Sequence, residues 1–126
     1  YFNFTVEDKQ KLRPVVLFDI LANNADRKGS HVFFENDTRR LFAIDHGICF
    51  HEETKLRTVL WDFAGQAISD ELLAPLASAA SWAERFEPYL NPSEIEALLL
   101  RVEELCESKI FPRPLQGRRA YPYPPI

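Results

Sequence analysis

The chain has 126 residues, 46% of them hydrophobic, and a net charge of −4 at neutral pH, which is enough for one domain with its own core. The acidic balance argues against binding to nucleic acid or to an anionic membrane, because both require clustered Lys and Arg side chains. No hydrophobic run approaches the ~20 residues of a membrane span, and the two cysteines favour a reducing, cytoplasmic location over a disulfide framework.

The first third of the sequence predicts a helical segment, a loop and a β-hairpin. Residues 5–23 carry a helical hydrophobic stripe, in which Pro14 is expected to start a new helix or to kink an existing one. Residues 23–30 are polar and typical of a loop. Residues 31–44 are aromatic and β-branched on either side of Asn36-Asp37, a pattern that predicts a hairpin with its turn at that pair.

The remaining sequence predicts two further helices. Residues 58–61 are compatible with either a short strand or a loop. Ser69 or Asp70 is a good N-cap for a helix that reaches about residue 86. A second helix is expected from Asn91 to about residue 109, because an N-cap, a proline in the first turn and an acidic residue three positions on occur together.

The last sixteen residues differ in composition from the rest. Five prolines lie between residues 112 and 125, so residues 111–126 are expected to form an extended, Pro-rich tail, either in a polyproline conformation or laid over the surface. We therefore expect a domain at residues 1–110 followed by this tail. The predicted fold class is α+β, mainly α, with one small hairpin.

Two aspartates stand at the ends of the predicted hairpin region. Asp26 lies in the polar loop, and Asp45 follows the second strand just before Gly47, whose lack of a Cβ would allow a sharp turn. Each could be ordinary turn chemistry. Together they fit phosphoryl transfer, which needs one carboxylate to orient the attacking hydroxyl and another to hold Mg²⁺ on the phosphates.

Two neighbours of Asp26 are candidates for supporting the loop. We expect Arg27 to brace it by pairing with a carboxylate, without contacting substrate. Asn24 would either orient the loop or cap the preceding helix, and the capping interpretation is the one that we favour.

These motifs resemble a known superfamily. The run NNADRKGSH followed by FAIDHG resembles the catalytic and metal-binding loops of the phosphatidylinositol 3-/4-kinase-like superfamily, and among them the type II phosphatidylinositol 4-kinases. WDFAGQAISDEL is similar to a further segment of that group. The chain also resembles a bacterial family of unassigned function within this superfamily, which carries the NADRKG-H, IDHG and LRTVLWDFAG runs nearly as written. The resemblance covers about residues 17–73.

The resemblance implies a fold and a set of roles. It implies the C-terminal lobe of a protein-kinase-like fold that uses ATP and Mg²⁺, or Mn²⁺ in its place. Asp26 would be the catalytic aspartate and Asp45 the principal metal ligand. His31 occupies the position where the lipid kinases have a metal-holding Asn, so it is a candidate metal ligand; imidazole suits softer ions better than Mg²⁺.

The resemblance also implies what the chain would need as partners. A kinase requires an N-terminal lobe with a Gly-rich phosphate-covering loop and a Lys, whereas the first glycine here is Gly29 and the chain begins at Tyr1 without any Met. We therefore expect the missing lobe upstream and no phosphate transfer by this chain alone. Nucleotide is the expected partner, and the acceptor would be an unknown protein or small molecule.

Two other functions remain open at this point. The chain could be a non-catalytic kinase-like binding module (a pseudokinase), which His31 and the absent lobe both favour. It could also be a metal-dependent hydrolase that uses Zn²⁺ or Mn²⁺, with ligands drawn from His31, Asp45, His46 and His51.

Overall fold

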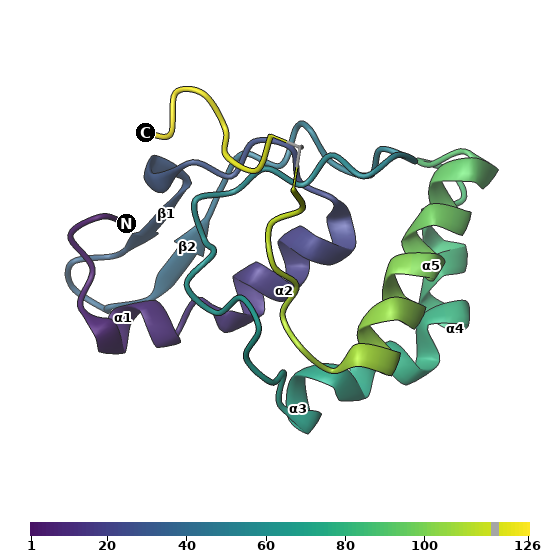
Figure 1. The fold of residues 1–126 in the computed structure, drawn as a ribbon, viewed down its shortest axis with the longest axis horizontal. Helices are drawn as coiled ribbons and strands as arrows, with labels where there is room; N and C mark the ends of the chain where they lie inside the picture. The colour runs from purple at the N-terminus through teal and green to yellow at the C-terminus, as the bar shows by residue number, and fades with distance from the viewer. Residues whose placement is uncertain (117–118) are drawn as a thin grey trace.

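Helix α2 (Arg13–Ala22) runs through the middle of the molecule, with the β-hairpin on one side and α5 (Pro92–Ser108) on the other (Figure 1). The computed structural model describes residues 1–116 and 119–126. The other elements in these residues are α1 (Val6–Gln10), η1 (Gly29–His31), β1 (Val32–Phe34), β2 (Leu41–Ala43), α3 (Asp70–Leu73), η2 (Ala74–Ser78), α4 (Ala79–Ala83) and η3 (Glu84–Phe86), where η marks a 3-10 helix. The expected α+β class is confirmed.

The predicted break at Pro14 is present. Thr5 caps α1 by accepting a hydrogen bond from the backbone N–H of Asp8 at 3.1 Å. The chain then leaves the helix at residues 11–12, and Pro14 lies in the first turn of α2, where its missing N–H has no helical partner to lose. Residues 5–23 therefore form two helices joined at the proline.

The predicted hairpin is confirmed, with shorter strands than expected. The strands β1 and β2 pair antiparallel, and Phe33 and Phe42 stand opposite each other with their rings stacked at 5.6 Å. The turn takes up residues 35–40: Glu35 and Arg40 are linked by a backbone hydrogen bond of 2.9 Å, and Arg39 has a positive φ of 56°. Each strand is therefore limited to three residues.

The segments after the hairpin are less regular than the sequence suggests. Residues 58–61 form no strand, and only Thr58 makes a single parallel bridge, to Arg27. The helix expected over residues 69–86 is capped by Ser69 as predicted, but it is divided into α3, η2, α4 and η3. Pro75 in the first turn of η2 accounts for the first division, because proline cannot continue the hydrogen-bond pattern of an α-helix.

Helix α5 begins where its capping signals predict. Asn91 accepts a hydrogen bond from the Glu94 N–H, and Glu94 accepts one from the Asn91 N–H, both at 2.9 Å. The helix packs against α2 and α4. The residues that form the buried core come from these three helices, η2, the hairpin, the connecting loops and the start of the tail: Leu12, Val16, Leu17, Val32, Val59, Leu60, Phe63, Ile68, Leu76, Ala79, Leu98, Val102, Leu105 and Phe111.

The Pro-rich tail is laid over the domain. Its first residue, Phe111, is 1% exposed and packs on Phe63 with ring centroids 5.8 Å apart. Further along, the carbonyl of Ala120 accepts a hydrogen bond from the Thr58 N–H at 3.0 Å, and that of Pro125 accepts one from the Gly29 N–H at 2.8 Å. Residues 117 and 118 of the expected tail lie outside the described residues. The tail is thus bonded to a residue on each side of the hairpin, Gly29 before it and Thr58 after it.

No helix in residues 1–116 or 119–126 is both long and hydrophobic enough to cross a membrane.

The burial of Phe111 predicts that the tail contributes to the stability of the domain. Phe111→Ala should lower the free energy of unfolding by about 3–5 kcal/mol, because it removes a fully buried ring from a packed core. Leu115→Ala, at a tail side chain that is 55% exposed, should change it by no more than about 0.5 kcal/mol. Urea unfolding followed by circular dichroism measures both, and equal effects of the two substitutions would contradict the packing described here.

Candidate functional site

The loop that carries Asp26 begins with a residue in the left-handed conformation. Asn23 ends α2 with φ 52° and ψ 48°, a conformation that Asn tolerates better than most residues. Its side-chain amide donates to the carbonyls of His51 and Glu53, and its side-chain oxygen accepts from the Lys55 N–H at 2.9 Å. Asn23 therefore ties the loop to residues 51–55. Sequence reasoning missed this residue, although an Asn directly after a helical pattern was a usable signal.

A buried ion pair holds the loop against α2. The guanidinium of Arg27 donates from Nε to Asp19 Oδ2 and from Nη2 to Asp19 Oδ1, both at 2.8 Å. Neither side chain is more than 1% exposed. The third nitrogen, Nη1, donates to the carbonyl of Ile44 at 2.9 Å, so the same side chain also holds the end of β2. The bidentate geometry is available to Arg and not to Lys.

Asn24 orients the loop, and it is Asn23 that caps α2. The Asn24 side-chain amide donates to Asp19 Oδ1 at 3.1 Å, and its side-chain oxygen accepts from the backbone N–H of Asp26 at 3.0 Å. Asn24 is fully buried. The backbone N–H of Asn24 also donates to the Asp19 carbonyl at 3.0 Å in the last part of α2, so Asn24 contributes to the end of the helix and orients the loop through its side chain.

Asp26 itself remains within reach of solvent. Its carboxylate is 27% exposed, and Lys28 Nζ lies 3.9 Å from Asp26 Oδ1. Asn24 and Arg27 hold the main chain on either side of Asp26. The buried neighbours therefore set the position of the carboxylate, while the carboxylate itself is accessible from solvent.

The sharp turn of the backbone that was expected at Gly47 occurs at Asp45. Its φ is 61°, whereas Gly47 has no positive φ. Asp is among the residues that tolerate the left-handed region, because its short side chain can bond locally. The expected turn is therefore made by Asp45 itself, and a Cβ added at Gly47 would lie in ordinary contact, 3.7 Å from Asp45 Oδ1. The Asp45 side chain is 57% exposed.

His31 connects the loop to Asp45. It is the last residue of η1, its side chain is 11% exposed, and its Nε2 lies 3.4 Å from Asp45 Oδ2. The other ring nitrogen, Nδ1, accepts from the Lys28 N–H at 3.2 Å. The two ring nitrogens of His31 thus face the backbone of Lys28 and the carboxylate of Asp45, and the role of His31 as a metal ligand stays a prediction.

Hydrogen bonds bring the two aspartate-bearing segments side by side. The Ala25 N–H donates to the carbonyl of Ile48 at 2.9 Å, and Arg27 Nη1 donates to the carbonyl of Ile44. These bonds therefore flank Asp26 on one segment and Asp45 on the other. Near Asp45 along the chain, burial raises the pKa of the Cys49 thiol to about 11, with Asp19 and Asp45 raising it further and Arg27 lowering it.

The candidate metal ligands are distributed over several contacts. Within residues 1–116 and 119–126, no three His, Cys, Asp or Glu side chains lie together so as to hold a metal ion. His46 instead packs edge-on against Phe18, and His51 Nδ1 accepts from the Glu53 N–H. Mg²⁺ is commonly held by one or two carboxylates, with water and substrate phosphates as its other ligands, a role that Asp26 and Asp45 suit.

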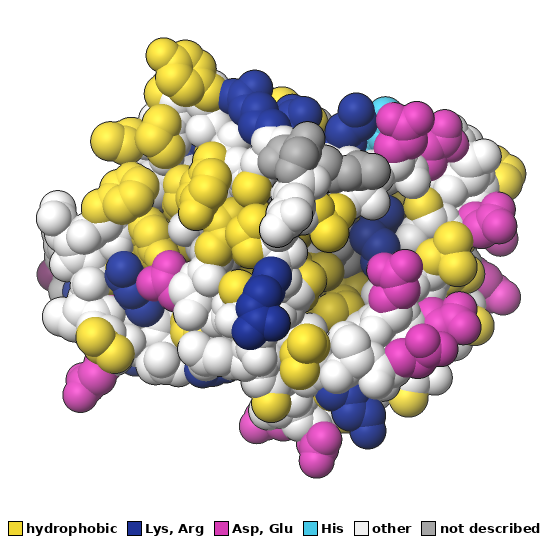
Figure 2. Space-filling view, viewed as in Figure 1, with side chains coloured by type: hydrophobic (Ala, Val, Ile, Leu, Met, Phe, Trp, Pro, Cys, Tyr) yellow, Lys and Arg dark blue, Asp and Glu magenta, His cyan; other side chains and the backbone are white. Residues whose placement is uncertain are grey.

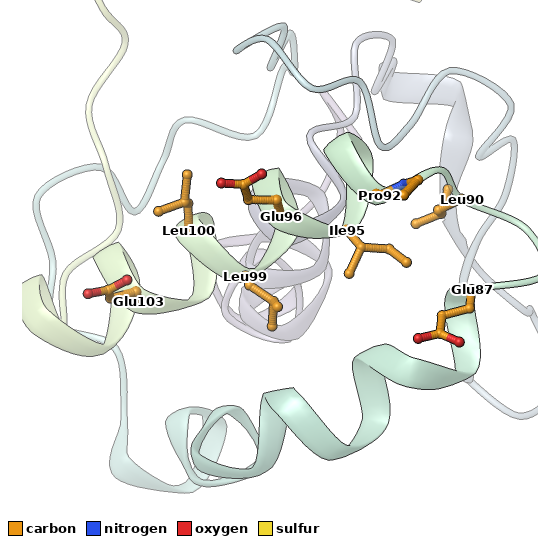
Figure 3. Close-up of a pocket in the computed structure, with 8 residues that line it drawn as sticks. All are labelled: Glu87, Leu90, Pro92, Ile95, Glu96, Leu99, Leu100 and Glu103. Atoms are coloured by element: carbon orange, nitrogen blue, oxygen red, sulfur yellow. The ribbon is translucent and has the colours of Figure 1, made fainter.

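A shallow groove elsewhere on the surface contains none of these residues. It runs along α5, has a hydrophobic floor formed by Ile95 and Leu99, and is flanked by Glu87, Glu96 and Glu103 (Figure 3). The candidate site is thus separate from this groove.

Comparison with known proteins shows one informative similarity. The chain is 40% identical, over 122 residues and 93% of its length, to Protein Rv2133c of Mycobacterium tuberculosis. It spans only 43% of the length of that relative. No protein-family model matches the chain, and no solved structure matches it.

The buried ion pair predicts a large difference between two substitutions. Arg27→Met should lower the free energy of unfolding by about 3–5 kcal/mol, because Asp19 would be left as a buried and unpaired charge. Lys9→Met breaks a more exposed pair, Lys9–Asp62 at 3.3 Å, and should cost no more than about 1 kcal/mol. Chemical unfolding measures both variants. A small loss for Arg27→Met would show that the loop does not depend on this pair.

Proposed function

We propose that the chain is the C-terminal lobe of a phosphatidylinositol 3-/4-kinase-like phosphotransferase, which uses ATP and Mg²⁺ or Mn²⁺ to phosphorylate a hydroxyl group. The observation that carries the proposal is the pair of contacts that join the two aspartate segments, Ala25 to Ile48 and Arg27 to Ile44. They support a shared site for Asp26 and Asp45, which is what the resemblance of the two motifs requires.

In this proposal the two carboxylates have different tasks. Asp26 orients the acceptor hydroxyl and takes its proton, a role that suits a partly exposed group on a rigid loop. Asp45 holds the metal ion, which when bound neutralises charge on the nucleotide phosphates. Lys28, 3.9 Å from Asp26, places positive charge where the transferred group gathers negative charge.

The buried residues act as positioning groups. Arg27 and Asn24 hold the main chain of Asp26, and both are sequestered from any ligand. His31 Nε2 lies 3.4 Å from Asp45 Oδ2, a contact that limits the orientation of this carboxylate, and Oδ1, beside Gly47, is the oxygen proposed to bind the cation. In this proposal the Asn of the lipid kinases is replaced by a residue that orients the metal ligand.

The proposal assigns the nucleotide-binding lobe to a separate segment. Phosphoryl transfer needs a loop that covers the phosphates and a Lys that pairs with them. The alignment covers only 43% of the Mycobacterium tuberculosis relative, so the unaligned part of that protein is long enough to contain such a lobe. The acceptor would be a protein or a soluble small molecule.

The proposal predicts a defined pattern of losses in a form of the protein extended upstream. Asp26→Asn should lower the rate of ATP-dependent phosphate transfer about 10²–10⁴-fold while leaving Mg-ATP affinity nearly unchanged, because the general base is lost. Asp45→Asn should weaken the binding of Mg-ATP itself. Asp37→Asn, at an exposed position in the hairpin turn, is the matched control and should alter neither.

Isothermal titration gives the affinities, and transfer of radiolabelled phosphate gives the rates. The 126-residue chain titrated in parallel should bind Mg-ATP weakly and transfer nothing. Tight binding by this short form, or full activity of Asp26→Asn in the extended form, would refute the proposal.

A second candidate, a non-catalytic kinase-like module, is favoured by the contact between His31 and Asp45. A carboxylate already paired at 3.4 Å has one oxygen fewer to offer a metal ion. In that case the extended protein would bind nucleotide without transferring phosphate, and Asp26→Asn would leave its function unchanged. For the hydrolase alternative, no group of three or more candidate metal ligands, including His31, Asp45, His46 and His51, is found in the part of the chain that the structure describes.

A further inference from the structure

A larger cavity lies between α5, residues 54–57 and the Pro-rich tail. It encloses about 710 Å³, which is within the size range of sites for small organic ligands. Figure 2 shows the middle of this face hollowed beside the tail, with hydrophobic side chains at depth and Lys or Arg side chains next to them. The hydrophobic part of the lining includes Leu56, Trp61, Leu105 and Leu115.

The charge of this cavity is opposite to that of the protein. Five basic side chains line it: Lys55, Arg57, Arg101, Arg113 and Arg119. Glu104 is the acidic side chain in the described part of the lining. The whole chain has 15 Lys and Arg against 19 Asp and Glu, so one third of its basic residues gather around one cavity of an acidic protein. Such a concentration attracts anions.

Two of these arginines carry buried donors without a partner. Arg101 is held by bonds from Nε to the carbonyl of Leu21 at 2.8 Å and from Nη1 to that of His51 at 3.4 Å. Its Nη2, and the Nε of Arg57, are buried and have no hydrogen-bond partner among residues 1–116 and 119–126. Buried donors are nearly always satisfied in folded proteins, so these two nitrogens call for an explanation, such as an ordered water molecule or an ion nearby.

The ionisation of Arg101 is consistent with a missing counterion. Burial lowers the pKa of its guanidinium, and the charge of Glu104 offsets this only in part. Arg side chains recognise carboxylates and phosphates through two parallel hydrogen bonds, and Arg57 and Arg101 both line the cavity, so their guanidinium groups are suited to hold an anion there.

We propose that this cavity binds an organic anion, with its phosphate or carboxylate group at Arg57 and Arg101 and its hydrophobic body against Leu56 and Trp61. The site is separate from Asp26 and Asp45, and it does not depend on the proposed phosphotransfer. A neutral molecule of the same shape would gain the hydrophobic contacts without the attraction of the five basic side chains, so the anionic group sets the specificity.

The test uses three small molecules that share one ring system. 1-Naphthyl phosphate and 1-naphthaleneacetate carry the two kinds of anion, and 1-naphthalenemethanol is neutral. The ¹⁵N-labelled chain has two indole N–H signals: that of Trp61, which lines the cavity, and that of Trp82, which donates to the carbonyl of Pro75 elsewhere. Both anions should shift the Trp61 signal saturably and leave that of Trp82 in place, and whichever binds more tightly identifies the preferred group.

Substitutions separate binding at the arginines from simple hydrophobic binding. Arg57→Gln and Arg101→Gln should each weaken the anions at least about tenfold, because each loses charge-assisted hydrogen bonds. Arg85→Gln, at an exposed position on η3, should change their affinity less than about twofold. Arg57→Gln keeps the test decisive if Arg101→Gln fails to fold, because the Arg57 side chain has no described bond to lose through Nε. Binding of the alcohol as tightly as the anions, or unchanged anion affinity in Arg57→Gln, would overturn the proposal.

Discussion

The ion pair between Arg27 and Asp19 connects three parts of the molecule. Asp19 belongs to α2, Arg27 to the loop, and the carbonyl of Ile44 that Arg27 also binds belongs to the end of the hairpin. Burying two charges is costly unless every polar atom finds a partner. Here each guanidinium nitrogen donates, and Asp19 accepts from Asn24 as well. The pair therefore acts less as a source of net stability than as a constraint on how these three parts meet.

That constraint explains why the main chain at Asp26 is held by buried neighbours, whereas Asp45 is more exposed and held by fewer contacts. Asp26 follows a buried Asn24 and precedes a buried Arg27, so its main chain has little freedom. Asp45 lies on an exposed turn and depends on its own left-handed backbone and on His31 for its orientation. If Asp26 and Asp45 have the roles that we propose, the base would be held rigidly and the metal ligand would be the more accessible of the two, which suits a reaction in which positioning supplies much of the rate enhancement.

Sequence reasoning succeeded where the deciding interactions are local. The proline that starts α2, the capping box of Asn91 and the hairpin all depend on residues within a few positions of each other. It failed where more than one position could make a turn and tertiary contacts decide between them. The backbone turns at Asp45 and not at Gly47. The division of residues 69–86 into short helices was missed because their hydrophobic pattern was weighed more heavily than Pro75.

The cavity was beyond prediction from sequence because its basic residues come from segments up to about sixty positions apart and meet only when the tail folds back. Arg57 gives this long-range arrangement a link to the candidate site. Its N–H donates to the carbonyl of Asn24 and its carbonyl accepts from the Arg27 N–H, each at 3.0 Å, so its main chain spans Asp26. An anion that orders the Arg57 side chain would act on the residue that holds this loop. If such an anion changes the affinity of a ligand that binds at Asp26, that ligand must change the affinity of the anion by the same factor, because coupling between two sites is reciprocal.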